Sequence, residues 1–272
     1  MGENVWVGES LWTGILLLFL GHALGDFYLQ SKNTVRKKEK KFPYLIMHAI
    51  IYTLCLTALL LITCQIHLDL AWLIPLIFVT HALIDMAKCQ AEKVAPRLPL
   101  LKTKQNVSEF LFFIDQGLHI GTLVLWAFLF SPYIIPQPWF TNLPLIDSVF
   151  KAGTGEGIHP AVLLTALVCV VRPASIIIEK IMIICDIQPT VDTGFPNGGK
   201  VIGILERLLV FFLLLMGQFS TIGLVVAAKS LARFRDLDDR KCAEYYIIGT
   251  FLSLVTVGAV ALIMFAASKY QI

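Results

Sequence analysis

Charged residues are scarce in this chain. Asp, Glu, Lys and Arg make up only 15% of its 272 residues, whereas 57% are apolar, and the mean hydropathy is +0.77. Soluble domains usually contain about 25% charged and about 45–50% apolar residues. The composition therefore excludes an ordinary soluble domain and predicts an all-α, polytopic transmembrane helix bundle.

Several other features are also missing. The net charge is only +3 and no basic domain stands out, so we expect no nucleic-acid partner. The six cysteines are scattered, without a CxxC spacing, which argues against a redox pair or a zinc knuckle. The first residues, MGENVWVGESLWTG, contain no Lys or Arg, whereas a cleaved signal peptide begins with basic residues. We therefore expect the first apolar segment to remain as a membrane span.

Apolar segments long enough to cross a bilayer dominate the chain, since a span needs about 20 such residues. About seven candidates (six to seven) reach this length: 11–31, 43–64, 70–89, 108–131, 158–184, 201–228 and 243–267. A segment rich in Pro and Gly divides them. This predicts a four-span front domain (1–131), an interfacial loop (132–160) and a rear domain of transmembrane segments (161–272).

The placement of Lys and Arg predicts the orientation. The connections SKNTVRKKEKK and AKCQAEKVAPRLPLLKTK, after the first and third spans, are basic, and cytoplasmic loops carry such an excess. The amino terminus is therefore expected outside.

The rear domain follows this rule less well. Residues 229–241 are basic, yet seven spans would place them outside. Arg172-Pro173 inside the fifth candidate suggests a kinked, short or re-entrant segment that would change the parity. We further expect 231–241 to lie on the membrane surface, and Glu206 to pair with Arg172 or Lys180.

Three predicted spans carry a histidine and an aspartate four residues apart. The motifs are HALGD, HALID and DQGLH, with the pairs His22/Asp26, His81/Asp85 and Asp115/His119. This spacing places both side chains on one face of a helix. The second span adds His48, followed by Tyr52 at the same spacing.

The order of the residues within each pair follows the direction of its span. Spans expected to run inward read His then Asp, and the span expected to run outward reads Asp then His. The histidines therefore lie deeper in all three, and the aspartates lie about 6 Å nearer the cytoplasm by the helical rise. Four helices would thus share a layer of histidines beside a layer of aspartates.

Imidazole and carboxylate groups together suit Zn, Fe or Mn, and helix bundles often build metal sites from inward-facing side chains. Three carboxylates cannot all stay ionised in an apolar interior unless a cation is bound, and otherwise some of them must be protonated. We therefore predict a divalent-metal site near the cytoplasmic face. Its candidate ligands are His22, Asp26, His48, His81, Asp85, Asp115 and His119.

Further roles can be assigned around this site. An aspartate that is not a ligand can act as a base, which makes Asp26, Asp85 and Asp115 the catalytic candidates. Polar residues on the cytoplasmic side that can contact a substrate are Gln30, Lys88 and Gln116. The same residues also fit a proton or ion relay, or haem ligation by the histidines.

These motifs carry a resemblance as well. The segments GHALGDFYLQ, MHAIIY, HALIDMAK and FFIDQGLH, with GGKVIGILERLL, AAKSLARF and AEYYIIGTFLS in the rear, resemble a bacterial family of polytopic membrane proteins catalogued as domain of unknown function 3307. The resemblance implies a protein of the bacterial inner (cytoplasmic) membrane and transfers no activity. The HxxxD motifs are also similar to those of bacterial membrane-bound metal-dependent hydrolases, which is an analogy of motif alone.

Three functions remain open at this point. The first is a metal-dependent hydrolase that acts on a lipid or another amphiphilic substrate at the cytoplasmic face of the bilayer. The second is a transporter that conducts protons or metal ions through the polar layers. The third is a structural membrane partner protein whose polar layers only hold the bundle together.

Overall fold

The protein is helical in the part of the chain that the computed structural model describes: residues 3–30, 37–38, 41–95, 106–144, 158–187, 198–232 and 239–268. Helices long and apolar enough to cross a membrane number six in these ranges: Ser10–Tyr28, Phe42–Thr63, Leu70–Val94, Val107–Tyr133, Pro160–Ile184 and Arg240–Ser268. The prediction of an all-α, multi-pass membrane protein is confirmed.

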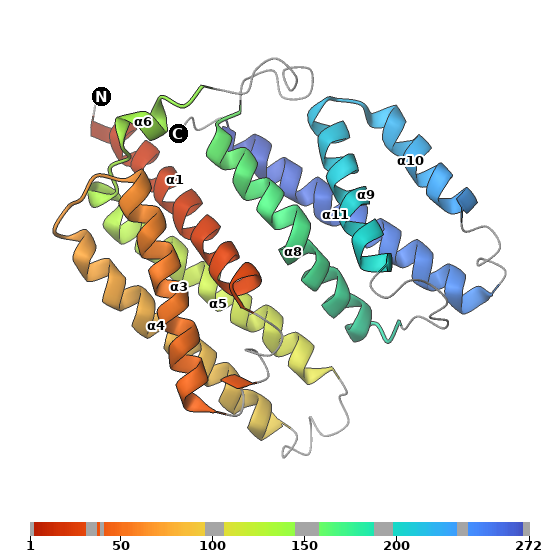
Figure 1. Cartoon of the computed structure of the whole chain (residues 1–272), viewed down its shortest axis with the longest axis horizontal. Helices are drawn as coiled ribbons and strands as arrows, with labels where there is room; N and C mark the ends of the chain where they lie inside the picture. Colours follow the sequence, from red (N-terminus) through yellow and green to blue (C-terminus); the bar gives the residue numbers. More distant parts are fainter. Residues whose placement is uncertain are drawn as a thin grey trace. The chain divides into compact units, whose positions relative to one another are not determined.

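The chain divides into two compact units, one within residues 1–143 and one within 144–269. The front unit contains α1 (Glu3–His22), the π-helical turn η1 (Ala23–Tyr28), α3 (Phe42–Thr63), α4 (Leu70–Val94) and α5 (Val107–Phe130) (Figure 1). Its helices form a closed ring, because α1 and α4 each pack against both α3 and α5. This arrangement turns one face of every helix toward a shared interior.

Two glycines allow α1 and η1 to approach α3 closely. A Cβ atom added to Gly25 would lie 2.6 Å from Cδ2 of Tyr52, and one added to Gly21 would lie 2.8 Å from Cγ of Leu56. Small residues at such positions let membrane helices pack backbone to backbone. The close approach brings η1, which carries Asp26, beside the first turns of α3.

The segment after α5 is more ordered than the interfacial loop predicted for 132–160. Its described part contains η3 (Ser131–Tyr133) and α6 (Pro138–Thr141). The amide of Gln65 donates to the carbonyl of Ile135, and the amide of Gln137 donates to the carbonyl of Thr63, both at 2.8 Å. These bonds fasten the segment to the end of α3.

The rear unit contains α8 (Pro160–Ile184), α9 (Gly198–Leu215), α10 (Phe219–Ala232) and α11 (Arg240–Ser268) (Figure 1). The expectation of a single span over 201–228 is wrong. Gly217 has a φ of 68°, a left-handed conformation that glycine adopts without strain and that commonly ends helices. Two shorter helices, of 18 and 14 residues, replace the span.

Proline does not interrupt α8, which continues for 25 residues, so the short segment considered at Arg172-Pro173 is not observed. A proline inside a helix lacks an amide hydrogen and disturbs the bonds of the preceding turn. Arg207 of α9, which is buried, donates to the carbonyl oxygens of Val170 at 3.0 Å and Val171 at 3.4 Å. These bonds satisfy carbonyl groups beside the proline, so α8 continues to Ile184.

Glu206 has a partner that was not among those expected. Its carboxylate pairs with Lys229 of α10, a helix that packs against α9. An amphipathic stretch is predicted at 231–241. Most of it, residues 233–238, lies outside the described residues.

We predict that Gly25→Ala destabilises the front unit. The added methyl group would enter the volume of the Tyr52 ring, and overpacking of this kind costs about 1–3 kcal/mol. The melting temperature of the protein in detergent should therefore fall. Gly121→Ala is the matched control on α5, because an added Cβ there meets nothing within 4 Å. Equal melting temperatures for the two variants would contradict the close contact.

Candidate metal centre

The seven predicted ligands meet in the interior of the front unit. We call them the His/Asp cluster: His22, Asp26, His48, His81, Asp85, Asp115 and His119. The four histidines, Asp85 and Asp115 each expose 4% or less of their surface, and the side chain of Asp26 exposes 7%. They come from η1 and the helices beside it, and each pair spaced by four residues faces the interior of the ring. The sequence reasoning therefore found a group of side chains that the fold brings together.

The π-helical turn positions the first carboxylate. Residues Ala23–Tyr28 close with the amide of Leu29 bonded to the carbonyl of Leu24 at 3.0 Å, five residues back. This wider turn carries Asp26, and π turns within helices often occur at functional sites. His48 of α3 lies 3.1 Å from the Oδ1 atom of Asp26.

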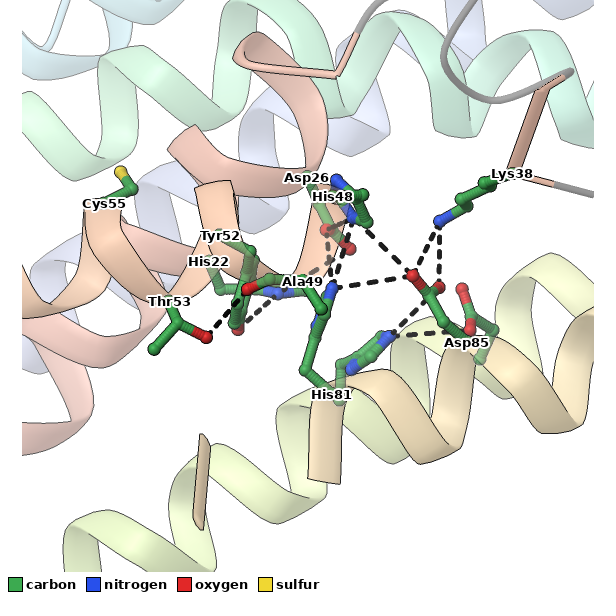
Figure 2. A network of polar contacts seen from close by, with 12 residues as sticks. His22, Asp26, Lys38, His48, Ala49, Tyr52, Thr53, Cys55, His81 and Asp85 are labelled. Atoms are coloured by element: carbon green, nitrogen blue, oxygen red, sulfur yellow. Dashed lines mark hydrogen bonds and ion pairs between the residues drawn. The ribbon is translucent and has the colours of Figure 1, made fainter. Parts of the chain in front are cut away.

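Four atoms of the cluster form a compact array. Nε2 of His48 lies 3.2 Å from Nε2 of His81. Oδ1 of Asp26 lies 3.1 Å from Nε2 of His48 and 3.7 Å from Nε2 of His81. Oδ2 of Asp85 lies 3.6 Å from each of these two nitrogens. Figure 2 shows these four side chains pointing toward one another. We call these four atoms the primary array.

Five of the six spacings within the primary array are close to those of a tetrahedral metal site. Ligand atoms about 2.0–2.1 Å from a tetrahedral ion lie about 3.3 Å apart from one another. The five distances given above range from 3.1 to 3.7 Å, whereas Asp26 and Asp85 belong to different candidate ligand groups, which share His81. Two imidazoles and two carboxylates are also a donor set that Zn, Fe or Mn accepts. The residues present therefore fit a divalent ion.

A second group of ligand atoms adjoins the primary array. Nε2 of His119 lies 3.5 Å from Oδ1 of Asp115 and 4.0 Å from Oδ1 of Asp85. Three overlapping groups in the cluster have ligand atoms within 4.8 Å of one another: Asp26/His81/His119, His48/His81/Asp85 and Asp85/Asp115/His119. His81, Asp85 and His119 each belong to two of these groups, so the possible sites are adjacent.

His22 is bonded differently from the other histidines. Its Nδ1 atom lies 3.2 Å from the hydroxyl of Tyr52, and its Nε2 atom lies 3.3 Å from Oε1 of Gln116. The amide nitrogen of Gln116 faces two carboxylates, at 3.2 Å from Asp115 and 3.5 Å from Asp26. Carboxylates only accept hydrogen bonds, so this orientation of the amide is the consistent one.

The tautomer of His22 follows from these partners. Oε1 of Gln116 can only accept, so Nε2 of His22 carries the proton, and Nδ1 accepts from the hydroxyl of Tyr52. Both ring nitrogens are thus occupied by neighbours outside the primary array. His22 lies in the cluster as an orienting group, in contact with the side chain that links two carboxylates.

Two lysines reach the cluster. Nζ of Lys38 donates to both oxygens of Asp85 at 2.9 Å (Figure 2), and Nζ of Lys88 donates to Oδ2 of Asp115 at 3.1 Å. Burial lowers the pKa of Lys38, but the negative charges of Asp85 and Asp26 outweigh this effect and raise the pKa above its ordinary value. Lys38 therefore stays charged at neutral pH.

The residues around the cluster differ in how clearly the sequence marks them. Lys38 was missed, because it is one of several lysines in SKNTVRKKEKK and nothing marks it as buried. Lys88 and Gln116, predicted substrate contacts, both bond to carboxylates of the cluster. The side-chain nitrogen of Gln30 is buried and has no hydrogen-bond partner among the described residues.

The comparison with known proteins adds one relationship. Residues 15–143 match the model of the family described as "Protein of unknown function (DUF3307)". No curated protein and no solved structure matches the chain. The matched segment contains the whole His/Asp cluster and ends where the front unit ends. The front unit of this chain is therefore similar to the DUF3307 family, as its motifs indicated.

Proposed function

We propose that the front unit binds a divalent metal ion through the primary array and uses it to hydrolyse a lipid or another amphiphilic substrate. The observation that carries the proposal is the spacing of 3.1–3.7 Å between imidazole nitrogens and carboxylate oxygens contributed by η1, α3 and α4. The proposed ligands are His48, His81, Asp26 and Asp85.

Charge balance supports a bound cation. Three carboxylates lie inside an apolar bundle, where an uncompensated charge costs several kcal/mol. Lysines neutralise Asp85 and Asp115, whereas the ion pairs of Asp26 within the described residues are with histidines. A divalent ion beside Asp26 would supply the missing positive charge.

The groups around the proposed ion favour hydrolysis as the reaction. A bound divalent ion would polarise a carbonyl or phosphoryl oxygen and help to activate water. Oδ2 of Asp26 points away from the primary array toward Gln116, and its hydrogen bond of 3.5 Å is long. This oxygen is the proposed proton acceptor. Lys88 exposes 18% of its side chain. Its ammonium group is the proposed contact for an anionic part of the substrate.

The position of the cluster in the spans supports an amphiphilic substrate. Asp26 lies near the end of the first span, His48 lies near the beginning of the second, and both adjoin the basic connection between them. We propose that this connection faces the cytoplasm of a bacterial inner membrane, by the positive-inside rule. The cluster would then meet substrates that reside in the cytoplasmic leaflet.

We predict that the purified protein carries divalent metal and that ligand variants lose it. His48→Ala removes an atom of the primary array and Asp26→Asn removes the negative charge of a proposed ligand, so metal affinity should fall by at least about 100-fold, above the range for outer-shell partners. Elemental mass spectrometry after chelator-free purification in detergent measures the metal content. His67→Ala is the matched control, because His67 is an exposed histidine outside the cluster.

Melting curves must accompany the metal measurement. A variant that keeps the wild-type far-UV spectrum and cooperative melting but loses its metal supports the proposal. A wild-type protein without metal, even after incubation with Zn²⁺, Mn²⁺ or Fe²⁺, would refute it.

We also predict that Lys38→Gln binds metal more tightly than the wild type. The ammonium group of Lys38 contacts both oxygens of a proposed ligand, and like charges a few ångströms apart repel by about 4 kcal/mol at an effective dielectric constant near 20. Affinity for Mn²⁺ should therefore rise at least tenfold in a titration. Lys37→Gln is the matched control, because Lys37 is the neighbouring residue and its side chain is exposed. Equal shifts in both variants would indicate a general surface-charge effect instead.

We expect metal-loaded protein to release a water-soluble product from a lipid extract of a bacterial membrane. The rate should fall at least about 100-fold in Asp26→Asn, because this substitution weakens a proposed metal ligand and also removes the proposed base. Lys88→Gln should raise KM more than it lowers kcat, because Lys88 is assigned to substrate binding. Mass spectrometry of the extract before and after incubation measures the turnover. Tight metal binding without any turnover would remove the support for catalysis.

A proton relay is the second candidate. One observation favours it: hydrogen bonds connect Tyr52, His22, Gln116 and Asp115 in sequence, and Lys88 continues the chain to a partly exposed position. Proton flux in proteoliposomes that disappears in Gln116→Leu, together with an inert lipid extract, would favour this function over hydrolysis.

A further inference from the structure

We propose that the front unit binds a second divalent metal ion and that the carboxylate of Asp85 bridges the two ions. The second site consists of Oδ1 of Asp85, Oδ1 of Asp115 and Nε2 of His119. This inference rests on the proposed function, because it assigns the other oxygen of Asp85 to an ion in the primary array.

The first support is a pair of buried polar atoms that lie near each other but make no hydrogen bond with any described residue. Oδ1 of Asp115 and Nε2 of His119 have no hydrogen-bond partner among the described residues, although the two residues expose only 4% and 2% of their surface. They lie 3.5 Å apart. Buried polar groups in this state are destabilising, and a cation between them would satisfy both.

The direction of the Asp115 carboxylate is fixed from its other side. Oδ2 accepts from Nζ of Lys88 at 3.1 Å and from Nε2 of Gln116 at 3.2 Å. With Oδ2 held in this way, Oδ1 faces His119 and Asp85. A metal ion at this place would therefore leave the bonds to Lys88 and Gln116 intact.

The second support is the division of the Asp85 carboxylate between two groups of nitrogens. Its Oδ2 atom lies 3.6 Å from the Nε2 atoms of His48 and His81, whereas its Oδ1 atom lies 4.0 Å from Nε2 of His119. Metal pairs in hydrolytic enzymes lie about 3.5–4 Å apart, a separation that one carboxylate can span. The carboxylate of Asp85 is thus placed to hold one ion with each oxygen.

Two stacked histidines place the two sites next to each other. The ring of His81, assigned to the first ion, stacks on that of His119, assigned to the second, with centroids 4.5 Å apart. His81 and Asp85 come from HALID on α4, and Asp115 and His119 come from DQGLH on α5. These two helices pack against each other. The second site therefore depends on the α4–α5 contact, whereas the first combines α4 with η1 and α3.

The numbers of protein ligands differ between the sites. The primary array offers four atoms, which is the number found in closed structural sites, and the second site offers three, as in sites that keep a position open for water or substrate. The second site would accordingly be the one with an open position, and the proposed hydrolysis would use the two ions together. The mixed nitrogen and oxygen donors favour Zn²⁺, Mn²⁺ or Fe²⁺ over Ca²⁺ or Mg²⁺.

Lys38 bears directly on this assignment. Its ammonium group donates to both oxygens of Asp85 at 2.9 Å, so it faces the carboxylate that would join the ions. Two bound ions would replace this single positive charge on the bridging group. Loss of the lysine should then tighten binding at both sites.

The test is a titration with Mn²⁺ alone, followed by elemental analysis and electron paramagnetic resonance. The wild type should bind two ions per chain and show the signal of an exchange-coupled pair, which requires a bridging ligand. His119→Ala and Asp115→Asn should each bind one ion and show an uncoupled signal. His67→Ala is the control histidine, since it lies outside the cluster, and should retain both ions.

The outcomes separate this inference from the proposed function. One ion in the wild type that is lost in His48→Ala but retained in His119→Ala would overturn the second site and leave the proposed function standing. Two ions without magnetic coupling would overturn the bridge. No bound ion would overturn both. Asp115→Asn nearly preserves the shape of its side chain, so cooperative melting of that variant guards against a trivial loss of fold.

Discussion

The structure depends on the burial of three carboxylates inside an apolar helix bundle. A carboxylate without compensation in such an interior is destabilised by several kcal/mol. Asp26, Asp85 and Asp115 are compensated by imidazoles, by two lysines and by the amide of Gln116. Each of these partners comes from a different part of the front unit, so charge compensation requires the whole ring of helices to assemble.

Packing between helices makes this compensation possible. Gly21 and Gly25 let α1 and η1 lie against α3, and the wider turn of η1 carries Asp26 to His48. The ring of Tyr52 then stacks on His81 with centroids 3.7 Å apart, while its hydroxyl donates to Nδ1 of His22. Tyr52 is therefore both a packing residue and an orienting residue, which connects the shape of the bundle to the electrostatics of the cluster.

The rear unit satisfies its polar groups by other means. Arg207 bonds to carbonyl groups beside Pro173, and Glu206 pairs with Lys229. Among the described residues 158–187, 198–232 and 239–268, no group of histidines, cysteines and acidic residues comparable to the His/Asp cluster occurs. The polar contacts of this unit therefore join neighbouring helices, and the described groups that could hold a metal ion lie in the front unit.

The sequence by itself determined the class of the protein and the members of the cluster. Apolar length predicts spans because the bilayer has a fixed thickness, and the spacing of His81 and Asp85 predicts a shared face because the helical repeat is fixed. Both are local properties that a single helix possesses before it packs. Only the tertiary structure decided which oxygen of Asp85 faces which nitrogen, that Lys38 is buried, that His22 bonds to Tyr52 and Gln116, and that the span expected over 201–228 ends near Gly217. These features depend on contacts between segments distant in the chain, or on a backbone conformation that one glycine permits without requiring it.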